Sequence, residues 1–257
     1  MMLVLSRGGN WGWGSTRTLV LGLVAVALLV AFVRRCASVE SPLLDLGILR
    51  TPGFAANVSA GFMQQAGFYS WFITAPLVMT GPWGWSVKEA GYALALSQIL
   101  ASVGSPVGGR LVGRSGHTTP IIAGSVINAA GSAWIALTAT DASAFCTSFL
   151  PGAALIGFGG GMCGTVTTGA ALAALPPSLL GLGNSTQQLI RRIGSATGVA
   201  LGVALLGEGT GHALVAGGKR VWWLDAIAHV CMLLPYVWLR LRHPGPTTHQ
   251  AVAAQMS

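Results

Sequence analysis

The sequence predicts an all-α, polytopic transmembrane helix bundle of about seven spans. Of its 257 residues, 53% are hydrophobic and only 8% are charged, and the mean hydropathy is positive, at +0.67. Soluble domains carry about 25% charged residues, so the composition excludes that class. Apolar runs also recur along the chain at close to the ~20 residues that a helix needs to cross a bilayer.

Seven such runs are predicted to span the membrane. Most have the length of one crossing, whereas the first is somewhat short and the fifth is long enough to tilt, or to kink at Pro151. The predicted spans are residues 18–33, 54–80, 90–112, 119–140, 144–174, 189–206 and 222–239.

The basic residues predict the orientation of the spans. Cytoplasmic loops are rich in Lys and Arg, and a cytoplasmic carboxyl terminus gives the better fit, with nine basic residues inside against five outside. We therefore expect a multi-pass protein of the cell membrane, in contact with the lipid bilayer, and no nucleic-acid partner despite the net charge of +8. The inside set is Arg34, Arg35, Arg50, Arg110, Arg114, Arg191, Arg192, Arg240 and Arg242; the outside set is Arg7, Arg17, Lys88, Lys219 and Arg220.

The stretch from Gly104 to Thr118 is interpreted as the end of a span followed by a short basic turn. Gly104 and Gly108, four residues apart, would let a second helix approach closely. The following residues resemble the cytoplasmic loop motif of the major facilitator superfamily, although Gly113 stands where that motif has Asp. The residues that carry this resemblance are Gly109, Arg110, Gly113, Arg114 and Gly116.

Two further stretches resemble the fourteen-span drug:proton antiporters, a multidrug-efflux branch of that superfamily. One is the linker that contains Ser41-Pro42-Leu43-Leu44-Asp45, and the other is residues 187–202. The resemblance covers nearly the whole chain and implies only the carboxyl-terminal half of such a protein. The expected domains are residues 1–17, the remnant of a preceding span plus an outer loop; 18–33, an accessory helix; 34–53, a cytoplasmic linker; 54–243, the six-span transporter half; and 244–257, a cytoplasmic tail.

The implied activity is secondary active efflux of drugs or other amphipathic small molecules by proton antiport. We expect a chain of this extent to be a fragment that is inactive alone, or one chain of a split transporter, with an amino-terminal half as its partner. The alternative is a membrane-embedded interaction protein that pairs with other helices through Gly194, Gly198 and Gly202, which share one helix face at a spacing of four.

A substrate cavity is predicted along one stripe of the second span. Aromatic rings supply contact area for amphipathic molecules and amides orient them by hydrogen bonds, although such amides also serve simply to bond neighbouring helices. The candidates on that span are Asn57, Gln64, Gln65, Phe68, Tyr69 and Trp71, and Gln98 and Asn128 are added from later spans.

Charged groups within the spans are few. Of the six acidic residues only Asp225 enters an apolar run, near the expected outer boundary. We interpret it as an interfacial carboxylate that pairs with Lys219 or Arg220, with a proton-binding role as the alternative. Proton coupling would then come from the other transporter half. Arg191 and Arg192 would extend to the interface or hold an anionic group.

No enzyme, cofactor or metal site is expected. The stretch Gly159-Gly160-Gly161-Met162-Cys163-Gly164 fits a dinucleotide-binding pattern, but no strand precedes it, so we interpret it as close helix packing. The five histidines and four cysteines show no spacing typical of a metal or catalytic site.

Overall fold

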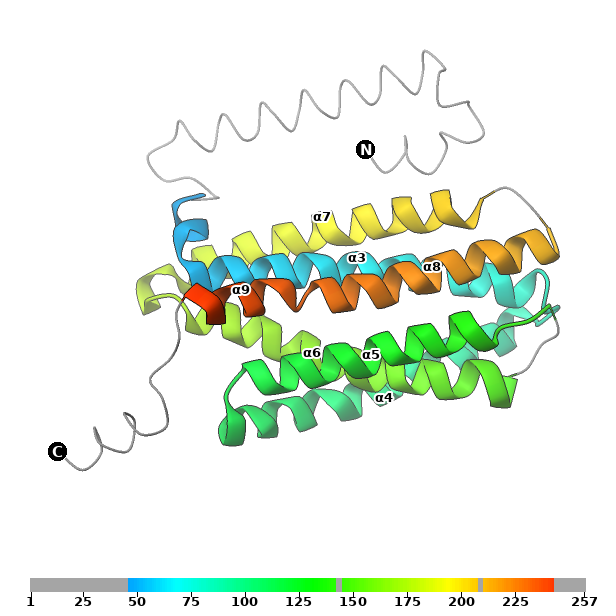
Figure 1. Cartoon of the computed structure of the whole chain (residues 1–257), viewed down its shortest axis with the longest axis horizontal. Coiled ribbons are helices and arrows are strands. Elements are labelled where there is room, and N and C mark those ends of the chain that lie inside the picture. The colour runs from blue at the N-terminus through cyan, green and yellow to red at the C-terminus, as the bar shows by residue number, and fades with distance from the viewer. Residues whose placement is uncertain (1–45, 142–144, 208–209, 243–257) are drawn as a thin grey trace, which may run out of the picture.

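The computed structural model describes residues 46–141, 145–207 and 210–242, and these form a bundle of six long helices (Figure 1). No strand occurs in these ranges, so the all-α prediction is confirmed for them; the predicted span 18–33 lies outside the described residues. The long helices are α3 (Pro52–Thr80), α4 (Val87–Ser115), α5 (Thr118–Thr138), α6 (Leu150–Ala173), α7 (Leu180–Leu206) and α8 (His212–Cys231). Shorter elements are η1 (Leu46–Arg50), the π-helical η2 (Phe145–Phe149), η3 (Pro177–Leu179) and α9 (Leu234–Arg242).

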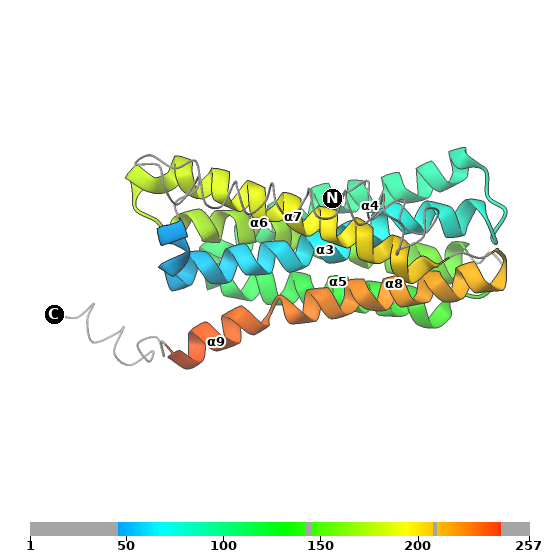
Figure 2. The same cartoon turned by 90° about the horizontal axis from the view of Figure 1, so that it is seen from above.

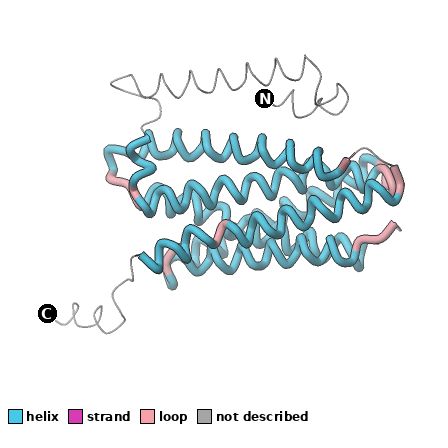
Figure 3. Tube along the Cα trace, turned by 45° about the horizontal axis from the view of Figure 1, so that its top comes forward, coloured by secondary structure: helices cyan, strands magenta, loops and turns pink. Residues whose placement is uncertain are grey.

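The six long helices form two groups of three. In one group α3 packs against α7 and α8, and in the other α6 packs against α4 and α5. Contacts of α3 with α6 and of α5 with α8 join the groups. The helices run side by side along the length of the bundle (Figures 1 and 2), and short turns connect most of them (Figure 3). Helices α3 and α6 therefore occupy the centre.

Five of the helical segments are long and apolar enough to cross a membrane. A helix of that length spans the hydrocarbon core, because each residue adds about 1.5 Å along the axis. Helix α3 is as long as α4 but is not among the five, since amide residues such as Gln64 and Gln65 lower its hydropathy. The five segments are Val87–Ser115, Thr118–Thr138, Phe145–Ala173, Pro177–Leu206 and His212–Trp238.

The last two predicted spans begin too late. They were predicted to start at residues 189 and 222, whereas α7 begins at Leu180 and α8 at His212. Polar residues in the first turns of both helices lower the hydropathy there, so the apolar runs start later than the helices do. The polar Thr186 and Gln187 are buried, and Gly217 lies against the backbone of α7.

The last predicted span is also not continuous. Helix α8 ends at Cys231 and α9 begins at Leu234. Pro235 favours a break here, because proline has no backbone N–H to donate within a helix and fits best in the first turn, where it lies in α9.

The basic stretch at the end of α4 is helical rather than a turn. Helix α4 continues to Ser115, and Gly116 ends it with a φ of 73°, a left-handed conformation that favours glycine. Gly109, Arg110, Gly113 and Arg114 are therefore exposed positions on its last turns. The motif lies on the end of a helix instead of in a loop.

Glycines bring the helix backbones of α4 and α6 into contact. A Cβ added at Gly104 would lie 2.2 Å from the Phe158 carbonyl oxygen, and one at Gly108 would lie 2.5 Å from that of Met162. Side chains at these positions would force the two helices apart. Small residues are a common means of close helix packing in membranes.

The glycine face of α7 makes the same kind of contact with α3. A Cβ at Gly198 would lie 2.1 Å from the Ala66 carbonyl oxygen, and Gly194 and Gly202 meet the backbones of Phe62 and Ser70. This face is covered within the chain. In this bundle the face is therefore not open to a helix of another protein, which the alternative hypothesis would need.

The amino-terminal end of α4 has a stabilising cap that a single substitution tests. The Glu89 amide donates to the Ser86 hydroxyl at 3.2 Å, and the Ser86 amide donates to the Glu89 carboxylate at 2.8 Å. We expect Ser86→Ala to lower the free energy of unfolding by about 1 kcal/mol. Thermal unfolding in detergent measures it, with Ser102→Ala as control, because the Ser102 hydroxyl only bonds a carbonyl within its own helix. Equal effects of both changes would contradict the capping role.

Candidate functional site

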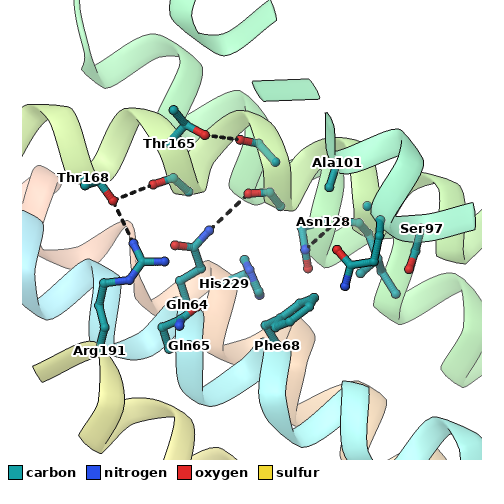
Figure 4. Close-up of a pocket in the computed structure, with 16 residues that line it drawn as sticks. Gln64, Gln65, Phe68, Ser97, Ala101, Asn128, Thr165, Thr168, Arg191 and His229 are labelled. Carbon is teal, nitrogen blue, oxygen red and sulfur yellow. Dashed lines mark hydrogen bonds between the residues drawn. The ribbon is translucent and has the colours of Figure 1, made fainter. Parts of the chain in front are cut away.

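A cavity of about 430 Å³, open on one side, is lined by residues from all six long helices (Figure 4). Helices α3 and α6 supply most of its wall, and a glycine-rich surface of α6 leaves it open space. The lining residues are Gln64, Gln65, Phe68, Ser97, Gln98, Ala101, Asn128, Ile156, Gly157, Gly160, Gly161, Gly164, Thr165, Thr168, Arg191 and His229.

Two buried amides of the wall keep a hydrogen-bond acceptor unused. The Gln64 Nε2 donates to the Gly160 carbonyl at 3.3 Å and to the Cys163 sulfur at 3.1 Å. The Asn128 Nδ2 donates to the Ile156 carbonyl at 3.0 Å. Within the described part of the chain, neither amide oxygen has a partner. A buried acceptor without a partner is unfavourable, so these two oxygens are polar groups of the wall that the chain itself does not satisfy.

Arg191 brings a positive charge to the cavity. Its Nη1 donates to the Thr168 hydroxyl at 2.8 Å, and among the residues that the structure describes it forms no ion pair with a carboxylate. The next residue, Arg192, is exposed. The sequence left both arginines with the same two interpretations, and the structure distinguishes them: Arg191 lines the cavity and Arg192 does not.

Asp225 is not an interfacial carboxylate. Because α8 begins at His212, Asp225 lies well inside the helix and has an exposed fraction of 0%. Its Oδ2 accepts a hydrogen bond from the Ser132 hydroxyl of α5, and its Oδ1 lies 3.1 Å from the Nδ1 of His229. The expected pairing with Lys219 or Arg220 is therefore wrong.

Five of the eight predicted cavity residues do surround the cavity: Gln64, Gln65, Phe68, Gln98 and Asn128. The other three do not line it. Asn57 accepts a hydrogen bond from the Tyr236 hydroxyl at 2.8 Å, and Trp71 is fully buried in an apolar cluster with Val78 and Trp222. Tyr69 is half-buried with its ring against Phe68, at 5.5 Å between centroids.

Sequence reasoning missed His229, Thr168 and the lining glycines of α6. A signal for His229 was present, because Asp225 and His229 are four residues apart in an apolar stretch and therefore share a helix face. The dismissed run that begins at Gly159 gave a partial signal. The run does pack closely against other helices, with Gly159 on α5 and Gly161 on α4, but Gly160, Gly161 and Gly164 also line the cavity.

Membrane-length helices around a cavity with polar side chains in its wall, with ionisable groups held inside the bundle, are features of membrane transport proteins. The family model described as Major Facilitator Superfamily matches residues 57–255 of the chain. The chain therefore belongs to the Major Facilitator Superfamily.

Its relatives include proteins named for drug transport and resistance. The chain is 29% identical to the multidrug transporter protein MdtP of Bacillus subtilis over 231 residues. This alignment covers 88% of the present chain and 41% of the relative. It is 26% identical to the lincomycin resistance protein LmrB of Listeria monocytogenes, over 81% of this chain and 44% of the relative. It is also 26% identical to a tetracycline resistance determinant of Streptomyces rimosus, over 78% of this chain and 58% of the relative. The aligned part of the chain thus spans less than two thirds of each relative.

Proposed function

We propose that this chain forms the carboxyl-terminal six-helix half of a drug:proton antiporter of the fourteen-span branch, which exports amphipathic small molecules across the cell membrane. The supporting observation is the cavity, whose wall combines an aromatic ring, unused amide oxygens and a guanidinium around about 430 Å³. That combination suits a bulky molecule with both apolar and polar parts. The relatives named for multidrug transport and antibiotic resistance favour the same substrate class.

The proposed transport cycle needs a second six-helix bundle. In this fold two halves rock about a site between them and expose it to each side of the membrane in turn. The relatives, of which the chain spans about half, are long enough to contain such a bundle. We expect the chain to bind substrate but to carry no flux by itself, with its carboxyl terminus on the cytoplasmic side.

Drug binding tests the proposal directly. The full 257-residue chain, purified and placed in lipid nanodiscs, is titrated with tetracycline by fluorescence and with lincomycin by calorimetry. We expect saturable binding of at least one of them. Flux into liposomes, with and without the co-expressed amino-terminal half of MdtP, then tests the requirement for a second bundle.

A cavity-filling variant shows whether the drug occupies the proposed site. A Cβ at Gly164 would lie 2.8 Å from the Gln64 Nε2, so Gly164→Leu reduces the space beside that amide. We expect it to weaken binding about tenfold, or about 1.4 kcal/mol. Gly169→Leu on the same helix is the matched control, because Gly169 has open space around it. The proposal would be contradicted if neither drug bound. It would also be contradicted if Gly164→Leu and Gly169→Leu both left the affinity unchanged.

A further inference from the structure

His229 lines the cavity and has a ring nitrogen without a hydrogen-bond partner in the described part of the chain. Its Nδ1 lies 3.0 Å from the backbone carbonyl oxygen of Asp225 and 3.1 Å from the Oδ1 of the same residue. Both neighbours are oxygens that accept hydrogen bonds, so Nδ1 carries the hydrogen and the neutral ring keeps its lone pair on Nε2. Within the described residues Nε2 has no partner, although His229 has an exposed fraction of 0%.

Asp225 supplies a negative charge directly behind this imidazole. The Nδ1 hydrogen is directed at the backbone carbonyl, and Oδ1 is left without a hydrogen bond. An unpaired carboxylate oxygen inside a membrane bundle is costly unless a positive charge compensates it. A proton on Nε2 would provide that charge 3.1 Å away, measured from Nδ1 to Oδ1.

The surrounding helices bury both members of the pair, but only the imidazole borders the cavity. Ser132 of α5 holds Oδ2, and a Cβ at Gly67 of α3 would lie 2.5 Å from Oδ1, so the α3 backbone covers that side. Asp225 does not line the cavity, whereas His229 does (Figure 4). A proton that enters from the cavity would therefore meet the imidazole before the carboxylate.

Few other ionisable groups compete for this role. Of the helices in the bundle, α3 carries one ionisable side chain, Tyr69, which packs against Phe68, and α9 carries Tyr236, which donates to Asn57. Helix α6 contributes Cys163 and α7 contributes Arg191, while α5 contributes no ionisable side chain and α4 lines the cavity only with Ser97, Gln98 and Ala101. On α8 itself Lys219 and Arg220 lie nearer the start of the helix. Of the side chains just named from the helices around α8, Arg191 is the only one that always carries a charge. Its positive charge disfavours a second positive charge on His229.

We propose that His229 and Asp225 form a proton-binding site that opens into the substrate cavity, so that a proton and a substrate compete for it. The proton binds the lone pair of Nε2 and is returned to cavity water when a substrate occupies the space beside the ring. This inference deepens the proposed antiport, because it places a coupling site in this half of the transporter, whereas the sequence predicted that coupling would come from the other half.

Two measurements on the full chain test the site. Nitrogen-15 NMR of labelled histidines follows the ring of His229 from about pH 5 to about pH 9, with His229→Gln used to assign the signal. Indicator dyes in a weakly buffered solution count the protons released when tetracycline binds. We expect the ring of His229 to change its protonation state within this range and up to about one proton to be released per bound drug. The dissociation constant of tetracycline should fall by up to about tenfold for each unit by which the pH rises.

The variants separate this role from a structural one. His229→Gln and Asp225→Asn should abolish the proton release and flatten the pH dependence of binding. His212→Gln should change neither, because His212 is exposed on the first turn of the same helix and pairs with Asp141. The NMR titration of the unaltered protein remains decisive if a variant does not fold.

The possible outcomes distinguish the two proposals. A ring of His229 that keeps one protonation state over the whole range, or drug binding without proton release, would overturn the proton site and leave the drug cavity in place. A titrating His229 in a protein that binds neither tetracycline nor lincomycin would support the proton site and count against the proposed substrates.

Discussion

Replacement of Gly198 by leucine is expected to prevent formation of a stable bundle. A Cβ at this position would lie 2.1 Å from the backbone oxygen of Ala66, and a backbone cannot move aside as a flexible side chain does. Overpacking typically costs about 1–3 kcal/mol, and a clash with a helix backbone lies at the upper end or beyond. Because total stabilities are about 5–15 kcal/mol, we expect a large fall in thermal unfolding temperature in detergent and poor recovery of monodisperse protein.

Gly181→Leu provides the matched control for this change. Gly181 belongs to the same helix, but it is exposed and has open space around it. Leucine there should leave the unfolding temperature nearly unchanged, and Gly198→Ala should fall between the two. Similar unfolding temperatures for Gly198→Leu and Gly181→Leu would show that α3 and α7 are not in the contact described.

The existence of the helices was predictable, whereas their ends were not. Apolar content and run length predicted α3 to α6 closely, because long apolar runs have few alternatives to a helix in a bilayer. The starts of α7 and α8 contain polar residues such as Gln187 and Lys219, which lower the hydropathy but stay helical. Contacts between helices decide these ends, and a single sequence does not display them.

The sequence predicted which face of α3 borders the cavity, but not at which level along the helix the cavity lies. A helical wheel places Gln64, Phe68 and Trp71 on one face of α3, and that face does turn toward the interior. Trp71 lies about two turns beyond Gln64, at a level where Val78 and Trp222 fill the space. A helical wheel gives only the angular position of each residue about the helix axis. It does not show at which height along the axis a cavity lies.

Asp225 shows how one error in a helix boundary alters a chemical interpretation. With the span starting at residue 222, the carboxylate was expected in the interface beside Lys219 and Arg220. With α8 starting at His212, it is buried against Ser132 and His229. The spacing of Asp225 and His229 was visible in the sequence, but its meaning depended on where the helix begins.

Loss of the Arg191 guanidinium is expected to have the largest effect on drug binding. The side chain packs beside Gly61 of α3, with its Cγ 3.6 Å from where a Cβ at that glycine would lie, and its head bonds Thr168 at the cavity wall. One N–H bond to Thr168 leaves further donors for an oxygen-rich ligand such as tetracycline. Hydrogen bonds to charged groups contribute about 1.5–3 kcal/mol, so Arg191→Met should weaken tetracycline binding by up to about a hundredfold.

Arg192→Met separates this contact from a general loss of positive charge. Both variants remove one charge from neighbouring positions of α7, but only Arg191 lines the cavity, while Arg192 is exposed. Fluorescence titration should show a large rise in the dissociation constant for Arg191→Met and almost none for Arg192→Met. Equal losses would mean that the arginines act through long-range attraction, and no loss in either would place the drug elsewhere. Arg191→Lys should recover part of the affinity, because lysine keeps the charge but lacks the planar set of donors that arginine offers.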